Sequence, residues 1–511
     1  MSASVTTQCG EILGLQHQDH QEFRGIPYAE QPIGVARFKA PEPLLAFDEP
    51  YQATCFKDSA PQEEIPLFGI NETSEDCLYL NIWTPNSDDK KRPVLVWIHG
   101  GAYVTGSGSQ SLYDGKNIAT KGDMVVITLN YRLGALGYLY LNDLLPDLDV
   151  SPNNGLLDQI EALKWIKENI IHFGGNPQDV TLAGESAGAM SIATLLASPM
   201  ASGLFHKVIL QSGAADQALT RAEANEITTT FLKAAEVSMD HPEKLWQLST
   251  QQIVKAQREC LKMSYDRGTY NQPVLQKGMT LLPVMDGEVL AQSPLSSLTR
   301  GDSKNIPMMI GCTRDEWNFF MKMPGAEGMI PSAKTKDMDK LTLIKLCERD
   351  LPGMGERAAN LYEKIVQQDN PGAGYGDIYS AFESDRMFRI PSLRIAEAQC
   401  EHNPEVYFFQ FEWSESLFGA CHASDIPFVF GNIDEGAGRM LTGGGDKAKK
   451  LSSIVQSCWI AFARSSDPAT DLVGKWPKFT KDTPNAMIFD QKIRIKEDPF
   501  VGVREIWERI L

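Results

Sequence analysis

The sequence predicts an α/β fold with a large, mostly parallel central sheet flanked by helices. Short, apolar, β-rich runs alternate with segments whose apolar residues recur at helical spacing, and this alternation is typical of parallel sheets covered on both faces. One such run, residues 179–183, leads through Gly184-Glu185-Ser186-Ala187-Gly188 into a helix-like segment. The chain has 511 residues, of which 42% are hydrophobic, so a large core is available.

The expected elements follow the chain in order. Residues 1–24 alternate in short pieces with turns at Gly10 and Gly14, which predicts an N-terminal β-hairpin. Strands are then expected at 77–85, 94–98, 124–129, 179–183, 207–210, 307–311 and 406–411. Helices are expected at 155–171, in two or three pieces over 221–260, over most of 336–403, and at 447–464.

We expect one domain that covers residues 1–511. Large α/β enzymes often keep a single sheet and add insertions to it, and the helical stretches at about 221–300 and 320–403 interrupt the strand pattern. These two stretches are therefore predicted to be cap-like helical insertions rather than separate domains.

Composition restricts the class of protein and its partners. The charged fraction of 22% is ordinary for soluble proteins, and the formal net charge of −18 argues against a nucleic-acid partner, which usually requires a basic surface. The N-terminal residues show no basic region followed by an apolar stretch, and no apolar run reaches the length of a membrane span. We therefore expect no signal peptide, no membrane association and a cytoplasmic location.

The nine cysteines are scattered, odd in number and without metal-ligand spacing. They predict a reducing compartment, in which most of them act as small core residues. No metal site is expected from them.

The 184–188 motif is the first candidate for chemistry. A strand, a tight turn with a central serine and a helix form the layout of a nucleophile elbow, in which Ser186 projects from the carboxyl end of the sheet. The Ala187 amide would point the same way at a helix N-terminus, where partial positive charge favours an oxyanion. The motif alone is weak evidence, because an ordinary glycine-rich strand–helix turn has the same pattern.

A serine nucleophile requires a histidine base, and chain order selects among eight histidines. In the α/β-hydrolase layout the order is nucleophile, acid, histidine, which excludes the four histidines that precede Ser186. His206 and His241 would compress the three residues into one βαβ segment, and His402 lies in a polar turn. His422 follows the strand that ends near residue 413 and is the candidate base; a buried structural histidine is the alternative.

The acid should lie between Ser186 and His422, just beyond a strand. Asp315 and Glu316 both follow the apolar run 307–311. Either carboxylate can accept the Nδ1–H of His422, so the residues themselves leave the choice open, and both also suit a charged helix N-terminus.

A hole for the oxyanion is predicted at residues 99–102. His99-Gly100-Gly101-Ala102 directly follows the 94–98 strand, and small residues let backbone amides approach a carbonyl oxygen closely. Gly101, Ala102 and Ala187 are the expected amide donors. His99 is expected to brace this loop, with a core histidine as the alternative.

With these residues placed, the chain resembles the type-B carboxylesterase family, which includes cholinesterases and bacterial para-nitrobenzyl esterases. The resemblance runs from about residue 5 to 500 and is greatest to the para-nitrobenzyl esterases. It is carried by Phe23-Arg24-Gly25-Ile26-Pro27-Tyr28-Ala29, Ser74-Glu75-Asp76-Cys77-Leu78-Tyr79-Leu80-Asn81, Trp97-Ile98-His99-Gly100-Gly101-Ala102, Asn130-Tyr131-Arg132-Leu133-Gly134, Asn154-Gly155-Leu156-Leu157-Asp158-Gln159, Phe173-Gly174-Gly175-Asn176-Pro177 and Gly184-Glu185-Ser186-Ala187-Gly188.

The resemblance implies an α/β-hydrolase fold and roles for further residues. It implies Glu316, not Asp315, as the acid and His422 as the base, with Glu185, Ser212 and Asp425 in supporting positions. It also implies two structural ion pairs, Arg37 with Glu75 and Arg132 with Asp158.

Three departures from the family pattern bear on these expectations. Ala60 stands where the partner of the half-cystine Cys77 is expected, so a Cys55–Cys77 bridge is open but disfavoured in a reducing compartment. The 56–76 loop lacks the tryptophan that cholinesterases use for quaternary ammonium groups. Trp317 replaces a common glycine, and it is expected to pack beneath the acid loop rather than narrow the pocket.

Together these expectations describe a serine carboxylesterase that hydrolyses small to medium esters through an acyl-enzyme, without cofactor or metal. The alternatives are a lipase or a carbamate, amide or thioester hydrolase with the same three residues, and more remotely a non-catalytic cholinesterase-like binding protein. The partner is a small-molecule ester, and the oligomeric state is left open between monomer and dimer.

Overall fold

The computed structural model describes residues 2–70, 72–213, 216–263, 279–323, 338–434 and 436–508. Within these residues thirteen strands form one sheet, in the order β1-β2-β3-β5-β7-β6-β8-β9-β10-β11-β12-β13, with β4 paired to β2. The strands are β1 (Ser2–Thr7), β2 (Gly10–Gln16), β3 (Gln21–Pro27), β4 (Tyr51–Gln52), β5 (Tyr79–Thr84), β6 (Arg92–Ile98), β7 (Val125–Leu129), β8 (Gly175–Glu185), β9 (Lys207–Gln211), β10 (Met308–Thr313), β11 (Val406–Phe411), β12 (Asn485–Phe489) and β13 (Arg494–Glu497).

The centre of the sheet is parallel and its two edges are antiparallel. Every neighbouring pair from β7 to β12 is parallel, whereas the pairs β1–β2, β2–β3, β3–β5, β5–β7 and β12–β13 are antiparallel. The short strand β4 pairs parallel with β2. Each residue of β7, β9, β10 and β11 is buried, as expected for parallel strands covered on both faces. The alternation of strand and helix in the sequence therefore predicted the sheet correctly.

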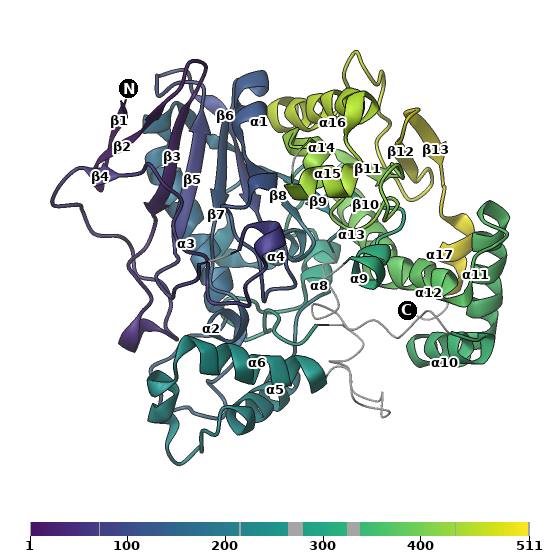
Figure 1. The fold of residues 1–511 in the computed structure, drawn as a ribbon, viewed down its shortest axis with the longest axis horizontal. Coiled ribbons are helices and arrows are strands. Elements are labelled where there is room, and N and C mark those ends of the chain that lie inside the picture. The colour runs from purple at the N-terminus through teal and green to yellow at the C-terminus, as the bar shows by residue number, and fades with distance from the viewer. Residues whose placement is uncertain are drawn as a thin grey trace.

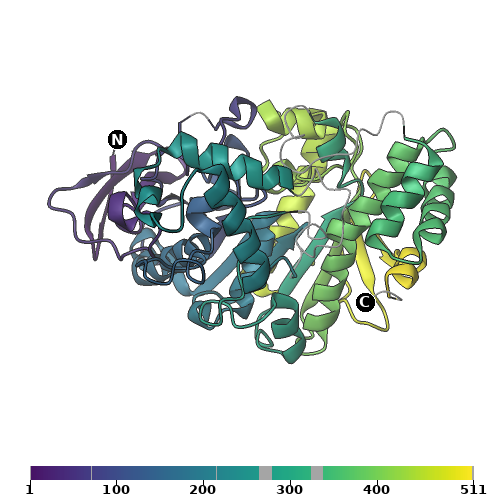
Figure 2. The same cartoon turned by 90° about the horizontal axis from the view of Figure 1, so that it is seen from below.

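Helices cover both faces of this sheet (Figures 1 and 2). One layer packs α1, α14 and α16 together, and the other packs α3, α4, α8 and α13 against β8 to β11. The helices are α1 (Lys116–Gly122), α2 (Gly134–Tyr138), α3 (Asn154–Asn169), α4 (Ala187–Ala197), α5 (Arg221–Ala234), α6 (Thr250–Met263), α8 (Pro294–Arg300), α9 (Asn318–Lys322), α10 (Lys340–Asp350), α11 (Gly355–Asp369), α12 (Tyr375–Ser384), α13 (Ile390–Cys400), α14 (Ile426–Phe430), α15 (Gly436–Thr442), α16 (Gly445–Ser465) and α17 (Val501–Glu508).

Local signals in the sequence explain several helix ends. Thr220 and Glu223 form a reciprocal capping box at the start of α5, which satisfies amides that the helix leaves unpaired. A 3₁₀-helical turn over Ile170–Phe173 follows α3 and ends at Gly174, which has a left-handed conformation. The Gly174-Gly175 pair in the sequence predicts this stop. None of the helices in the described ranges is long and apolar enough to cross a membrane.

The carboxyl-terminal edge of the sheet was not predicted. Strands β12 and β13 extend the sheet beyond β11. Residues Ala486 to Phe489 of β12 are all buried, and their short apolar run is the sequence signal that was overlooked. The predicted hairpin at residues 1–24 is present as β1 and β2, and β3 adds a third antiparallel strand. Parts of the two proposed insertions, residues 264–278 and 324–337, lie outside the described residues.

Both ion pairs implied by the family resemblance are present. Arg37 donates two hydrogen bonds to Glu75, at 2.7 and 2.6 Å. Arg132 and Asp158 are both buried and also share two side-chain hydrogen bonds, at 2.8 and 2.6 Å. Removal of one partner of so deeply buried a pair costs about 3–5 kcal/mol of stability, because the other charge is left unpaired.

All nine cysteines are free. Cys77 is buried and Cys55 is exposed, so the Cys55–Cys77 bridge left open by the sequence is not formed.

Candidate active site

Ser186 lies at a strained turn between β8 and α4. Its φ of 56° and ψ of −126° are unfavourable for a residue with a Cβ, and its amide donates to the Gln211 carbonyl of the neighbouring strand at 2.9 Å. A Cβ on Gly188 would lie 2.0 Å from the Ile98 carbonyl oxygen, so only glycine lets α4 cross the sheet this closely. The strand–turn–helix layout predicted for 179–196 is therefore present.

His422 and Glu316 meet at the carboxyl ends of β10 and β11. The Nδ1 atom of His422 lies 2.6 Å from Glu316 Oε2, and both side chains are buried. Glu316 Oε1 accepts hydrogen bonds from the Ser212 hydroxyl at 2.6 Å and from the Thr313 amide at 2.7 Å. Glu316 is thus fixed on one side and can hold the imidazole on the other.

Asp315 lies apart from the imidazole, although it is adjacent to Glu316 in the chain. Its carboxylate pairs with Arg314 at 2.9 Å and accepts the Ala420 amide at 3.1 Å. The two neighbouring carboxylates point in different directions at the end of β10, and only Glu316 faces His422.

Glu185 contacts the second nitrogen of His422. The Nε2 atom lies 3.0 Å from Glu185 Oε1, and within the described chain Ser186 Oγ makes no hydrogen bond to that nitrogen. Burial raises the pKa of Glu185 to about 8. Burial opposes the charged form of His422, but the carboxylates of Glu185 and Glu316 outweigh it and raise the pKa of His422 to about 9. In this arrangement His422 Nε2 therefore faces the Glu185 carboxyl group rather than the Ser186 hydroxyl.

Asp425 supports the site through Gln211 rather than through His422. Gln211 Nε2 donates to Asp425 Oδ2 at 2.8 Å, and Gln211 Oε1 accepts from the Trp459 indole at 2.9 Å. Burial raises the pKa of Asp425 to about 6. Gln211, which the sequence did not single out, thus links Asp425 to the backbone of Ser186.

The loop after β6 presents amides beside Ser186. Gly101, Ala102 and Tyr103 have φ values of 116°, 53° and 62°, and a Cβ on Gly101 would lie 2.1 Å from the Thr105 carbonyl oxygen. Within the described residues, the N–H groups of Gly101, Ala102 and Ala187 donate to no other protein group. They are available to stabilise a negative oxygen.

Two side chains brace this loop. Gln62 accepts from the Gly106 amide at 2.7 Å and donates to the Gly106 carbonyl at 2.8 Å, and its Oε1 also accepts the Thr105 hydroxyl at 2.6 Å. His99 stacks on Tyr131 with ring centroids 4.5 Å apart and contacts the Gly100 carbonyl through Nδ1 at 2.8 Å. Burial lowers the pKa of His99 to about 4, which keeps it neutral. The bracing expected of His99 is observed, whereas Gln62 was missed.

Ser186 and His422 line a pocket that opens to solvent. The rings of Phe388, Phe320 and Phe319 lie 4.5, 5.2 and 5.9 Å from the imidazole of His422. The described residues that line the pocket include no lysine or arginine, and Glu185 is the only carboxylate among them. Most of the remaining lining residues are apolar, including Ile65, Phe68, Ile70, Leu112, Met190, Met387, Ile426 and Leu441, while Thr105, Gln110 and Tyr113 are polar.

A helical turn that was not predicted from the sequence contributes two side chains to the pocket lining. Residues Asp385–Arg389 form a single π-helical turn between α12 and α13, and this turn carries Met387 and Phe388 into the pocket. Trp317 is buried beside Phe320, at 4.8 Å between ring centroids, and does not line the pocket. The expectation that Trp317 packs beneath the acid loop is therefore correct.

Comparison with known proteins agrees with this geometry. Residues 1–505 match the carboxylesterase family. The chain is 37% identical to the para-nitrobenzyl esterase of Bacillus subtilis over 504 residues, which cover 97% of this chain and 96% of the relative. It is 33% identical to the phenmedipham hydrolase of Pseudarthrobacter oxydans over 94% of each chain. A solved para-nitrobenzyl esterase structure superimposes with a TM-score of 0.85 at 35% identity and covers 100% of both chains.

These similarities extend over the whole length of the chain and include its fold. The sheet order, the two helical layers and the Ser186 turn form an α/β-hydrolase fold, as the sequence predicts. The chain belongs to the carboxylesterase family and is a carboxylic ester hydrolase.

Proposed function

We propose that Ser186, His422 and Glu316 form the catalytic triad of this esterase. The observation that carries the proposal is the 2.6 Å contact between His422 and Glu316, in the same pocket as a serine held at a strained turn. Ser186 Oγ attacks the ester carbonyl carbon, and its proton passes to His422 Nε2. Glu316 holds the Nδ1–H tautomer and stabilises the imidazolium that forms.

The amides of Gly101, Ala102 and Ala187 then bind the oxyanion of the tetrahedral intermediate. Each such donor contributes roughly 2.7–4 kcal/mol to transition-state stabilisation. Collapse of the intermediate breaks the ester C–O bond, and His422 protonates the departing alcohol. A water molecule, deprotonated by His422, then hydrolyses the acyl-enzyme and regenerates Ser186.

Because His422 Nε2 contacts Glu185, this nitrogen must become free to accept a proton before Ser186 can attack. For Nε2 to accept the Ser186 proton, any proton already on Nε2 must first leave this nitrogen. Burial raises the pKa of Glu185 to about 8, so this carboxyl group can itself hold a proton near neutral pH. Glu185 is therefore a positioning and proton-holding residue in the proposed mechanism.

The proposed substrates are neutral, predominantly apolar esters of small to medium size. The described residues that line the pocket are mostly aromatic and aliphatic and include no lysine or arginine that would pair with an anionic substrate. We further propose that the helical stretches at about 221–300 and 320–403 act as caps within one domain.

We also propose a reducing, cytoplasmic location, which the nine free thiols support.

Substitution of the nucleophile tests the proposal. Ser186→Ala should retain the native circular dichroism spectrum and lose hydrolysis of p-nitrophenyl acetate down to the background rate. A matched control is Ser191→Ala, which removes a buried hydroxyl from the same helix. Turnover by Ser186→Ala at a rate near that of wild type would refute the triad. A preference for long emulsified esters would instead favour a lipase.

A further inference from the structure

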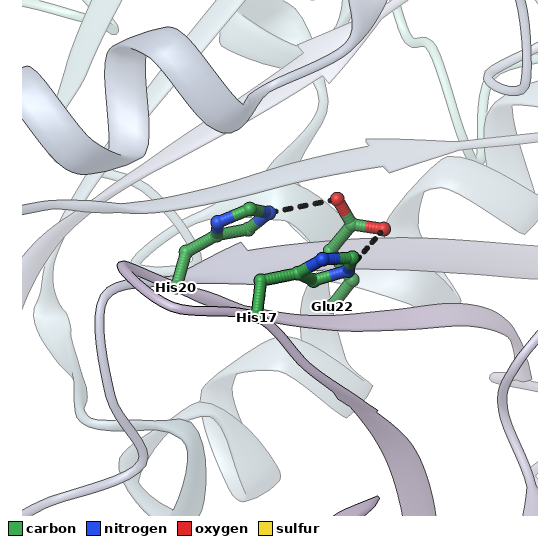
Figure 3. Close-up of side chains that lie close together, drawn as sticks. All are labelled: His17, His20 and Glu22. Carbon is green, nitrogen blue, oxygen red and sulfur yellow. Dashed lines mark hydrogen bonds and ion pairs between the residues drawn. The ribbon is translucent and has the colours of Figure 1, made fainter. Parts of the chain in front are cut away.

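A second cluster of chemically active side chains lies in the hairpin between β2 and β3, near the N-terminal edge of the sheet (Figure 3). It consists of His17, His20 and Glu22, whose nearest ligand atoms all lie within 4.8 Å of one another. The proposed catalytic mechanism does not use it.

The backbone of the hairpin builds this cluster. Gln16 pairs with Gln21, and the His17 amide donates to the His20 carbonyl at 2.9 Å, so His17 and His20 face each other across a two-residue turn. Side chains opposite each other in an antiparallel pair lie on the same face, and so do residues two apart in a strand. His17, His20 and Glu22 must therefore project from one face of the hairpin.

The possible ligand atoms of these three side chains lie close together. The two imidazoles are stacked, with centroids 4.4 Å apart and planes inclined by 5°. His20 Nε2 lies 2.8 Å from Glu22 Oε1, and His17 Nε2 lies 3.5 Å from Glu22 Oε2. Nitrogen and oxygen ligands about 2.0–2.1 Å from a tetrahedral Zn²⁺ are separated by roughly 3.3 Å, which is close to these separations. Rotation of one imidazole out of the stack would let both rings direct a nitrogen at the same ion.

Asp19 fixes the orientation of the most buried imidazole. Its carboxylate lies 2.7 Å from His20 Nδ1, so a hydrogen bond donated by Nδ1–H would leave the lone pair of Nε2 available to a metal ion. His20 Nε2 lies 2.8 Å from Glu22 Oε1, and either a proton or a metal ion between these two atoms would satisfy both. A carboxylate that holds the far nitrogen of a histidine is the usual support of a metal-binding imidazole.

Charge and access complete the site. Arg24 pairs with Glu22 Oε2, so Oε1 is the oxygen available to a metal ion. His20 and Glu22 are buried, whereas 41% of the His17 side chain is exposed, which gives an ion and a water ligand a route from solvent. Two imidazoles and one carboxylate favour Zn²⁺ and similar transition metals over Mg²⁺, which prefers oxygen ligands.

We propose that His17, His20 and Glu22 bind one divalent transition-metal ion, Zn²⁺ or a close analogue, with Asp19 as the positioning residue of His20. The ion joins the two strands at the turn and therefore stabilises this edge of the sheet. The site is separate from the ester-hydrolysing pocket, and the proposal is independent of the catalytic assignments.

Zn²⁺ titration of the chelator-treated, full-length protein tests the proposal. Isothermal calorimetry should show one saturable site per chain, and Zn²⁺ should raise the melting temperature. His17→Gln should weaken binding at least about tenfold and remove the rise in melting temperature. Asp19→Asn should weaken binding by about 10–100-fold, since it removes only the support of His20. Both positions are exposed, and unchanged esterase activity will show that the variants fold.

Two controls keep the result specific. His241→Gln removes an exposed histidine 3.4 Å from Glu243 on another part of the surface, and it should leave the Zn²⁺ affinity unchanged. Co²⁺ bound to the wild-type protein should show the visible absorption of a four-coordinate ion, which His17→Gln should abolish. Absence of saturable binding by the wild type, or affinity unaltered by His17→Gln, would overturn the proposal.

Discussion

Two buried histidines in this chain each lie between two carboxylates, yet their surroundings differ. His422 lies between Glu316 and Glu185, and His20 lies between Asp19 and Glu22. Around His422 are phenylalanine rings and a pocket that also contains Ser186. The His20 cluster instead contains a second imidazole, and Arg24 neutralises part of its charge.

This difference shows that a carboxylate–imidazole–carboxylate arrangement is not in itself a catalytic one. At His422 the carboxylates of Glu185 and Glu316 raise the pKa of the imidazole beside the nucleophile. At the hairpin the second imidazole, that of His17, supplies a further nitrogen ligand, which favours the proposed metal ion. The neighbours of each histidine, rather than the pair itself, determine the chemistry.

Among the variants that test this comparison, substitution of the proposed triad acid Glu316 should cause the largest loss of activity. Glu316→Gln keeps the shape of the side chain but no longer favours the required tautomer of His422, so kcat should fall by about 10⁴-fold, with little change in stability. Asp315→Asn is the matched control one residue away, and it should alter kcat by less than about threefold. Equal losses in the two variants would contradict the assignment of Glu316.

Loosening the oxyanion loop should have a smaller effect. Gln62→Ala removes hydrogen bonds to Thr105 and Gly106 and should lower kcat for p-nitrophenyl esters by about 10–100-fold, because the amides of Gly101 and Ala102 lose their fixed direction. The effect should appear in kcat more than in KM. Glu64→Ala, an exposed change in the same loop, should leave both constants near those of wild type.

The pH profile tests the contact between Glu185 and His422. Only a neutral His422 accepts the Ser186 proton, so activity should be lost as the pH falls through the raised pKa of this pair. Glu185→Gln removes a negative charge beside the imidazole and should shift the acidic limb of kcat/KM downward by about one pH unit. A limb that stays in place or moves upward would show that Glu185 does not control the base.

The smallest expected effect concerns the hairpin. His17→Gln should leave kcat, KM and the pH profile within about twofold of wild type, while it weakens Zn²⁺ binding. Steady-state kinetics with and without Zn²⁺ provide the measurement. A large loss of activity would mean that the hairpin cluster and the active site are coupled, which would contradict their proposed independence.

The fold was largely accessible from the sequence, because burial of a parallel sheet forces apolar, β-rich runs to alternate with helical segments. The Val94 to Ile98 run and the Gly184–Gly188 turn each have a local cause and are found where expected. Strands β12 and β13 were missed because β12 joins the sheet by pairing with β11, which lies far away in the sequence, and β13 then pairs with β12.

The candidate site was accessible only in part. Chain order singled out His422, but the choice of Glu316 over Asp315 depends on which way two adjacent side chains turn at the end of β10. The contact between Glu185 and His422 and the bracing of the loop by Gln62 join segments more than 40 residues apart in sequence. Such contacts arise from packing and leave no local pattern.

Covalent labelling tests the central claim most directly. A fluorophosphonate reacts with an activated serine, so intact mass spectrometry of the treated wild-type protein should show one adduct per chain, and peptide mapping should place it on Ser186. Ser186→Ala should remain unlabelled, and Glu316→Gln should label far more slowly than wild type. An adduct on another residue, or equal labelling of Ser186→Ala, would contradict the proposed triad.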